Sequence, residues 1–589
     1  MNASKNAGRW ALAVLGALVL IAPLKFSTPV VMQSFFPAPR DLWEWVFSPW
    51  PNPLLVMFVF AGLIWFAICR SDPSSRDCGI RASGAEPSKR RFDAAWWLPL
   101  LWLLTQIAAT PNSINLQVSL DTLLYFAACV VAFYAAARWV RDEKAANFVF
   151  GALTVATAVA CLVALQQRFG GFAATREYAT AYLDSSSLSD DLRLRMTSNR
   201  VFGTLAYPNA FAGFLVVAFA PILARIWQKH ANLGRIVRIA LASGIMMLCL
   251  VLTGSRGGFA ALAAAAVAGT LCLVRGRRIV RTMVAGVIVV IALVVVFVAA
   301  QRGGLMHWGR SSLEARLDYW NGAVRIAQDY PWLGTGPGTF GSVYLKYKTA
   351  TTEEAQLVHN DYLEMWCDSG VVAFTVFVAL WVVALGDAFR LARRRGDAVS
   401  VALCMALVGW VVHGLVDFDL YSPGVALPAF VLLGILRGLK GDVRQEVNHR
   451  RPLVLAVSVG LLSAVIWFEG RMLAANLAYG ESRDCGTDWQ AAITAAERAA
   501  ALAPRNALYK IAAGELLVSE GRFAEGLEYC RQAVENDPLR ARNHYRMAMA
   551  LATAGWPANE VSQELRRAVE LNPTKSEYRE ALQLLEENR

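Results

Sequence analysis

The chain has 589 residues, of which 56% are hydrophobic and only 17% charged, and its mean hydropathy is +0.40. This composition excludes a soluble protein, because most of such a chain must lie in lipid. The net charge of +12 would suit nucleic-acid binding, but the basic residues stand between apolar runs, which indicates membrane topology instead. The ten cysteines form no CxxC pair, so they predict neither a zinc site nor a disulfide framework.

Thirteen apolar runs are long enough, or nearly so, to cross a bilayer. They lie at 10–24, 53–69, 95–110, 120–139, 146–166, 209–228, 236–253, 257–274, 279–300, 370–389, 398–416, 425–439 and 452–469. The first run has no small-residue cleavage site, so we interpret it as a retained span and not as a signal peptide. We therefore predict an all-α fold, with a polytopic domain of about 12–13 transmembrane helices over residues 1–470.

Clusters of Lys and Arg occur in every second loop between these runs. Examples lie at 70–91, 275–281 and 390–395. Since short cytoplasmic loops carry an excess of basic residues, this alternation predicts that the N-terminus is cytoplasmic. The other loops then face outside, and they include a long polar loop at 301–368 and a shorter one at 413–424.

After Gly470 the sequence becomes Ala-rich, charged and helical in pattern. Pro504, Pro538 and Pro573 recur there at spacings of 34 and 35 residues. This period resembles that of tetratricopeptide repeats, so we predict a repeat-like helical domain outside the membrane over residues 471–589. Two interpretations stay open: a cap that packs on the membrane domain, and a surface that docks a partner protein or a glycan.

The long outer loop contains an amphipathic helical pattern. Ser311-x-x-Glu314 fits a capping box, and the pattern stops at Asp329-Tyr330-Pro331. Its apolar positions are Leu313, Leu317, Trp320, Val324 and Ala327. The pattern predicts that Arg316 projects from a helix near the membrane surface. Judged alone, such an arginine is more often a surface or snorkelling residue.

The same loop continues with a Gly-rich stretch and a histidine. PWLGTGPGTF, residues 331–340, matches neither nucleotide-binding pattern, so we interpret it as a tight turn that aims the next segment. In VHNDYLEMW, the spacing places His359, Tyr362, Leu363 and Trp366 on one face of a helix that leads into the next span. A lone histidine there is more often structural than catalytic.

Two arginines occur at other outer turns. Arg256 lies in TGSRGGFAAL, so close to the membrane that an anionic partner best explains it, and its neighbouring glycines would let a phosphate approach the backbone. Arg200 lies in RVFGTLAYPNAFAGF, where Asn209 is interpreted as a cap after Pro208.

A DxD motif occurs in the loop HGLVDFDLYSPG at Asp417 and Asp419. Such a motif holds a divalent metal in many glycosyltransferases, but a single DxD is common by chance. We therefore favour a helix entry or an ion pair with one of the arginines over a metal site.

Taken in order, RVFGTLAYPNAFAGF, TGSRGGFAAL, RLDYWNGAVRIAQDYPWLGTGPGTF, HNDYLEMWCDSG and HGLVDFDLYSP resemble the O-antigen ligase and O-antigen polymerase superfamily over residues 200–435. The resemblance implies a metal- and cofactor-independent membrane glycosyltransferase that takes its saccharide from undecaprenyl diphosphate. It implies that Arg256 and Arg316, with Arg200 as a weaker candidate, bind the diphosphate and that His359 is the catalytic base. Asn360, Asp417 and His413 are candidate supporting residues.

The resemblance also implies a place in the cell and a set of partners. The protein would lie in a bacterial inner membrane with its C-terminal domain in the periplasm, and it would bind no nucleic acid. The acceptor stays open among a glycan, the lipid A core and a protein hydroxyl. A polymerase, a protein O-oligosaccharyltransferase, and a non-catalytic scaffold or transporter that recruits envelope proteins through the repeat-like domain are the alternatives.

Overall fold

The computed structural model describes residues 2–36, 38–39, 41–69, 94–173, 199–228, 233–274, 311–348, 354–441, 451–485 and 488–587. These residues form helices, and no strand occurs among them, which confirms the predicted all-α fold. Nine of the described helices are long and apolar enough to cross a membrane. They are α1 (Asn2–Lys25), α5 (Leu116–Trp139), α6 (Glu143–Gln166), α9 (Pro208–Trp227), α10 (Leu233–Thr253), α11 (Arg256–Leu273), α15 (Asp361–Arg395), α17 (Pro423–Lys440) and α18 (Arg451–Asp484).

Three further helices coincide with other predicted apolar runs. These are α3 (Asn52–Cys69), α4 (Ala94–Ala109) and α16 (Ala398–His413). The predicted run at 279–300 lies outside the described residues. The chain is thus a multi-pass membrane protein.

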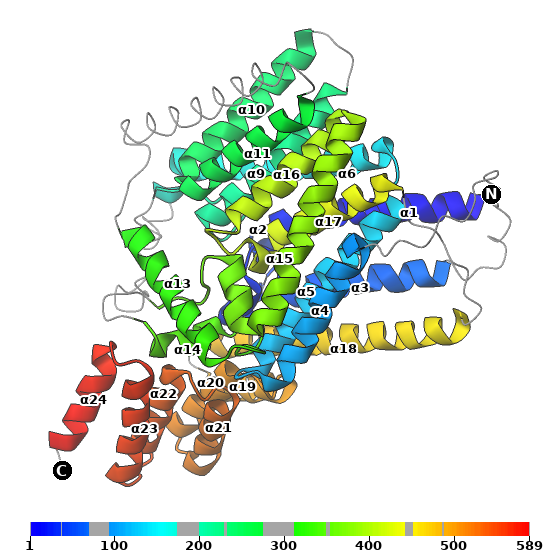
Figure 1. Cartoon of the computed structure of the whole chain (residues 1–589). Helices are drawn as coiled ribbons and strands as arrows, with labels where there is room; N and C mark the ends of the chain where they lie inside the picture. Colours follow the sequence, from blue (N-terminus) through cyan, green and yellow to red (C-terminus); the bar gives the residue numbers. More distant parts are fainter. Residues whose placement is uncertain are drawn as a thin grey trace.

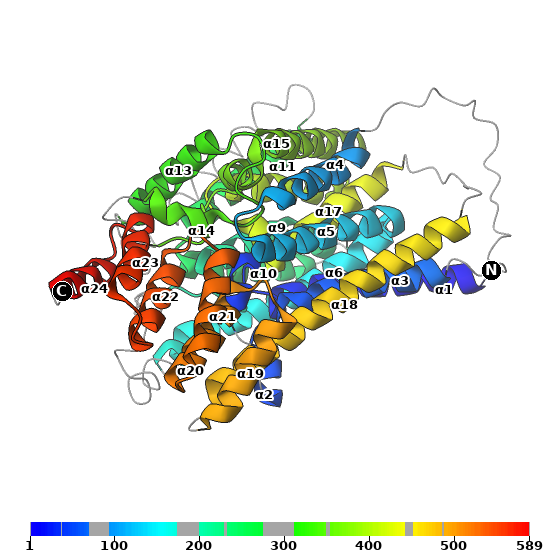
Figure 2. The same ribbon diagram turned by 90° about the horizontal axis from the view of Figure 1, so that it is seen from below.

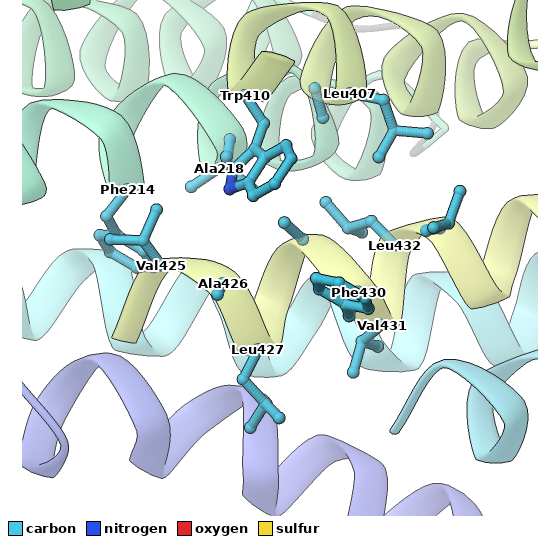
Figure 3. Packing of buried hydrophobic residues seen from close by; sticks show 14 of the residues in the cluster. Phe214, Ala218, Leu407, Trp410, Val425, Ala426, Leu427, Phe430, Val431 and Leu432 are labelled. Carbon is cyan, nitrogen blue, oxygen red and sulfur yellow. The ribbon is translucent and has the colours of Figure 1, made fainter. Parts of the chain in front are cut away.

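Helix α17 forms the centre of the membrane domain. Its side chains are buried from Pro423 to Leu439, and its contacts include α5, α1, α16 and α9. Figure 3 shows Phe430 of α17 below Trp410 of α16, with ring centroids 6.4 Å apart and ring planes at 83°. Because α16 and α17 are both fixed in this core, the short loop between them is held at a defined place at one end of the bundle.

Helix α15 is two helices joined by a kink. Gly370 has φ +80° and ψ 176°, which no residue inside an α-helix adopts. The amide of Val371 donates to the carbonyl of Pro331 at 2.9 Å, and that of Gly336 donates to Asp368 at 2.8 Å. The Gly-rich segment therefore docks on the kink, as a tight turn and not as a phosphate-binding loop.

The C-terminal part is a row of paired helices that covers one end of the membrane domain. It comprises α19 (Trp489–Leu502), α20 (Ala507–Ser519), α21 (Phe523–Asn536), α22 (Ala541–Thr553), α23 (Ala558–Leu571) and α24 (Ser576–Glu587). Helix α18 continues from the membrane into this part without a break at residue 470. The N-terminus of α1 and the repeat-like domain lie at opposite ends of the molecule (Figures 1 and 2). The tetratricopeptide assignment of these hairpins stays a prediction.

Hydrogen bonds fasten the repeat-like domain to the membrane domain. Buried Asp537 accepts from Asn115, the N-cap of α5, at 2.9 Å and from Ser342 of α14 (Phe340–Val343) at 3.2 Å. Asn572 donates to Glu354 at 3.0 Å. The repeat-like domain therefore packs as a cap on loops at one end of the membrane domain, and its place outside the membrane stays a prediction.

Candidate active site

His359 lies just before α15 in a conformation that is unusual for its residue type. Its φ is +57°, and it is the one non-glycine residue with positive φ in the described part of the chain. Asn360 is the N-cap of α15, and its Oδ1 accepts from the amides of Tyr362 and Leu363, both at 3.0 Å. The prediction that His359 shares a helix face with Tyr362, Leu363 and Trp366 is therefore wrong, because the helix begins two residues later. Asn360 supports the site by starting that helix.

The ring of His359 is held by a carboxylate and two aromatic rings. Its Nδ1 lies 3.0 Å from Oδ1 of Asp417. The ring stacks on Tyr319 at 5.8 Å between centroids and meets the edge of Phe418 at 4.7 Å. The His359 side chain is 27% exposed, whereas that of Asp417 is 2% exposed. When Nδ1 donates to Asp417, Nε2 keeps a free lone pair for a hydroxyl proton.

Asp417 stays ionised despite its burial. Burial alone would raise the pKa of this carboxyl, but the hydrogen bond and charge of His359 lower it, and the charges of His413 and Arg316 lower it further. The result is a pKa of about 2. A carboxylate that is charged near neutral pH accepts a hydrogen bond from Nδ1 of the neighbouring imidazole and so fixes its tautomer.

A second histidine and carboxylate pair lies beside the first. Nδ1 of His413 is 2.7 Å from Oδ2 of Asp419, and both side chains are 1% exposed. Each carboxylate of the DxD motif thus pairs with a histidine, and the charge of Arg316 also acts on Asp417. The predicted helix entry is present, since Asp419 begins the short 3-10 helix Asp419–Tyr421. In the described part of the chain, His413, Asp417 and Asp419 are the residues whose geometry would suit a metal, with ligand atoms within 4.8 Å of one another.

Three arginines from separate segments lie near the loop that contains Asp417 and Asp419. Arg256 is the first residue of α11, directly after its N-cap Ser255, and Arg316 lies on α13 (Ser311–Asp329). Burial lowers the pKa of Arg200, as do the charges of Arg316 and Arg256, while Asp417 opposes them. These mutual influences place the three predicted diphosphate-binding arginines in one electrostatic neighbourhood next to Asp417.

Arg200 is held by two hydrogen bonds of its guanidinium group. Its Nε donates to the carbonyl of Thr253 and its Nη2 to Oδ1 of Asn209, both at 2.7 Å. The neighbouring turn requires glycine, because Gly254 has φ +66° and a Cβ there would lie only 3.2 Å from Nε of Arg200. The prediction that Asn209 is a cap is wrong, because the N-cap of α9 is Tyr207 and the helix begins at Pro208. The side chain of Asn209 orients Arg200 instead.

The glycines beside Arg256 serve protein packing. A Cβ on Gly257 would lie 2.6 Å from Cγ2 of Val416, and one on Gly258 would lie 2.9 Å from Cβ of Ala212. These residues thus let α11 approach the loop of Asp417 and helix α9. This packing is enough to explain Gly257 and Gly258, so the predicted approach of a phosphate to their backbone stays a prediction.

Helix α13 forms where the pattern predicts it and ends at Asp329, but its buried face differs. Tyr319, Ala323, Ile326 and Ala327 are buried, whereas Leu317 is 47% exposed. The capping side chain of Ser311 lies outside the described residues. The shift of the buried face brings Tyr319 against His359, which the apolar pattern did not predict.

The residues that the sequence did not single out are Tyr319, Phe418 and the partnership of Asp417 with His359. No spacing rule signals them, because Asp417 and His359 are 58 positions apart. Phe418 lies between Asp417 and Asp419 in the DxD motif, and nothing in the sequence predicts its contact with His359.

A comparison with protein families finds a match in the middle of the chain. A family model described as O-Antigen ligase matches residues 241–378, a range that contains Arg256, Arg316 and His359. The match does not extend to the repeat-like domain. No curated protein matches the chain. In fold and motif order, and in the family match over residues 241–378, the chain is similar to the O-antigen ligase superfamily.

Proposed function

We propose that the protein transfers a saccharide from undecaprenyl diphosphate to an acceptor hydroxyl on the outer face of a bacterial inner membrane. The observation that carries the proposal is the His359–Asp417 pair beside Arg200, Arg256 and Arg316. A base next to a cluster of fixed cations suits a reaction in which a hydroxyl loses a proton and a diphosphate leaves.

The arginines neutralise the leaving group. The bond between the anomeric carbon and the diphosphate is already activated, so its cleavage mainly requires stabilisation of negative charge on the departing oxygens. Guanidinium groups bind such oxygens bidentately and stay charged. Arg256 adds the N-terminal end of α11, where backbone amides favour an anion.

His359 accepts the proton of the acceptor hydroxyl at Nε2. Asp417 holds the other ring nitrogen and stabilises the positive charge that develops on the ring. Attack opposite the leaving diphosphate forms the new C–O bond as the old one breaks, so one displacement inverts the anomeric centre. The proton of the hydroxyl passes to Nε2 of His359, and undecaprenyl diphosphate leaves with the electron pair of the broken bond.

We propose that this step needs no metal. The group that would suit a cation is already balanced, because each of its two carboxylates pairs with a histidine and Arg316 adds positive charge near Asp417. A divalent cation would contact the atoms that these pairs leave without a hydrogen bond, Oδ2 of Asp417, Oδ1 of Asp419 and Nε2 of His413, and it would be repelled by the positive charge of Arg316.

Turnover with purified protein tests the proposal. The full chain in lipid nanodiscs, supplied with a lipid-linked oligosaccharide and candidate acceptors, is expected to release undecaprenyl diphosphate. His359→Ala and Arg316→Ala should lower the rate by about 10²-fold or more. Arg325→Ala, an exposed arginine on the same helix as Arg316, should not. Full turnover in the His359 and Arg316 variants contradicts the enzyme assignment.

The product distinguishes the ligase from the polymerase within the family. In a deletion strain, long saccharide chains that stay on the lipid indicate a ligase, because polymerisation still proceeds without the protein. Single units on the lipid indicate a polymerase. The site is the same for both, so the saccharide pattern decides.

A further inference from the structure

The short helix α2 (Leu42–Phe47) presents large apolar side chains to the outside of the molecule. Leu42, Trp43, Val46 and Phe47 share one face of the helix and are 76%, 70%, 50% and 77% exposed. The rings of Trp43 and Phe47 stack, with centroids 6.1 Å apart and planes at 11°. Large apolar side chains gathered in this way mark a surface that contacts a partner or a membrane.

Polar groups at both ends of α2 are bonded within the protein. Asp41 caps the start, because its Oδ1 accepts from the amide of Glu44 at 2.8 Å. At the other end, Nζ of Lys25 donates to the carbonyls of Trp45 at 3.2 Å and Ser48 at 3.3 Å. A helix whose terminal groups are satisfied in this way can enter a region that contains little water.

Lys25 also fixes the place of α2 relative to the membrane. It is the last residue of α1, which is long and apolar enough to cross a bilayer, so its hydrogen bonds hold α2 at the end of that span. Helix α3 begins at Asn52, shortly after α2 ends, and a connection of this length covers at most about 18 Å. Figure 2 shows α2 at the edge of the molecule, away from the N-terminus of α1. Helix α2 therefore lies near the plane in which these spans leave the bilayer.

A row of aromatic rings joins α2 to an exposed side of α3. The ring of Trp45 lies 6.1 Å from that of Trp50, and the ring of Trp50 lies 6.5 Å from that of Phe58, between centroids. Phe58 belongs to α3 and is 45% exposed. Since α3 coincides with a predicted span, this exposed side faces lipid, and α2 lies next to it.

The charges of the segment indicate which force would hold it on a membrane. Residues 41–50, DLWEWVFSPW, contain two acidic residues and no Lys or Arg. Attraction to anionic headgroups requires basic residues, so it does not hold this segment. Burial of apolar surface is the remaining driving force, and tryptophan is enriched where headgroups meet acyl chains.

We propose that α2 is an interfacial anchor that inserts its four exposed apolar side chains between the lipids at the surface of the bilayer. The segment just before α2 contacts the repeat-like domain. Nδ2 of Asn506 donates to Oγ of Ser34 at 2.9 Å, and Arg540 lies over the ring of Phe35 at 5.0 Å. Insertion of α2 therefore sets the height of the repeat-like domain relative to the membrane. The inference does not depend on the reaction that the candidate active site catalyses.

Fluorescence quenching of the full chain in nanodiscs tests this inference. Phe47→Cys is labelled with a polarity-sensitive fluorophore in a background in which Cys69, Cys78 and Cys485 are replaced by Ser; the remaining cysteines are buried. A nitroxide on the acyl chain near the headgroup should quench the fluorophore about twofold more than one at the end of the acyl chain, because an interfacial helix reaches only about 5–10 Å into the bilayer. The result should be the same in zwitterionic and anionic lipids.

Two other labelled positions calibrate the depth. Val382→Cys, at a residue of α15 that is 64% exposed within the membrane-spanning part, should be quenched more by the deep nitroxide than by the shallow one. Glu528→Cys, at an exposed residue of α21, should be quenched by neither.

Removal of the two stacked rings shows whether the apolar face drives insertion. With the fluorophore on Leu42→Cys, the change of Trp43→Ser together with Phe47→Ser should lower quenching by the shallow nitroxide about twofold or more. The inference is overturned if the fluorophores on α2 are quenched no more than the one on Glu528→Cys, or if the double substitution has no effect. Shielding that occurs only when two copies share a nanodisc also overturns it, because the face would then bind a second copy of the chain.

Discussion

At the scale of single residues, the site is built around His359, whose backbone has a strained, left-handed conformation. A non-glycine residue in the left-handed region costs about 1–3 kcal/mol and persists only where its surroundings fix it. For His359 the fixing contacts are Asp417, Tyr319, Phe418 and the indole of Trp320, which donates to the carbonyl of His359 at 3.4 Å. Such strain with specific partners is typical of a position under functional constraint.

The pair of His359 and Asp417 makes stability depend on pH in the acid range. The folded pKa of Asp417, about 2, lies below the ordinary value near 3.8, so the carboxylate stabilises the fold above about pH 4 and loses this contribution as the pH falls toward 2. The full contribution is about 2 kcal/mol. Thermal unfolding in detergent between about pH 6 and pH 2 measures it.

Asp417→Asn serves as the comparison for that measurement. The variant should be less stable than the wild type near neutral pH, and the difference should shrink as the pH falls to about 2. A difference that does not depend on pH would show that the charge of Asp417 contributes nothing to stability.

Removal of metals tests the interpretation of the DxD motif. Since His359 and His413 already pair with Asp417 and Asp419, we expect EDTA to leave the rate of undecaprenyl diphosphate release unchanged. The measurement is turnover before and after chelation, with Mg²⁺, Mn²⁺ or Zn²⁺ added back. Activity lost in EDTA and restored by one of these ions would assign His413, Asp417 and Asp419 as a metal site.

At the scale of elements, two glycines set the relation between the outer loop and α15. Gly370 interrupts the helix, and Gly334 has φ +65° at the point where the Gly-rich turn meets it. A Cβ on Gly334 would lie 2.2 Å from the carbonyl carbon of Asp368. The first half of α15, which carries Asn360 at its start, is thus positioned by a contact of backbone on backbone.

Gly334→Ala is expected to disturb this contact. The substitution adds both a backbone clash and a strained φ, so we expect a loss of about 2 kcal/mol or more in stability and a lower turnover number. Gly244→Ala in α10 is the matched control, because nothing lies within 4 Å of its added Cβ, and alanine is the better helix former. Thermal unfolding and turnover of both variants check the prediction, which equal stability would contradict.

At the scale of the whole molecule, the cap and the candidate base lie at the same end of the bundle. Asn572 holds Glu354, five residues before His359, and Asp537 holds Ser342. The N-terminus of α1 lies at the opposite end (Figures 1 and 2). This arrangement agrees with the charge alternation of the loops, which predicts a cytoplasmic N-terminus and a periplasmic cap.

Labelling in intact cells tests that orientation. In a Cys485→Ser background, a membrane-impermeant thiol reagent admitted to the periplasm should label Glu528→Cys on α21 and not Arg394→Cys at the end of α15. Both positions are exposed, so access to the reagent decides the result. Labelling of the second variant alone would place the cap in the cytoplasm.

The sequence by itself determined the helices and the residue types of the site. Apolar runs give spans because burial in lipid depends on local composition, and Pro, Gly and capping residues end helices through local backbone geometry. His359, Arg256 and Arg316 were predicted from ordered motifs. The tertiary structure alone decided which side chains meet: the pairing of His359 with Asp417, the contact of His359 with Tyr319, and the hydrogen bond of Asn115 with Asp537 that holds the cap. These contacts join segments tens to hundreds of residues apart, and their formation depends on how whole helices pack, which no local pattern encodes.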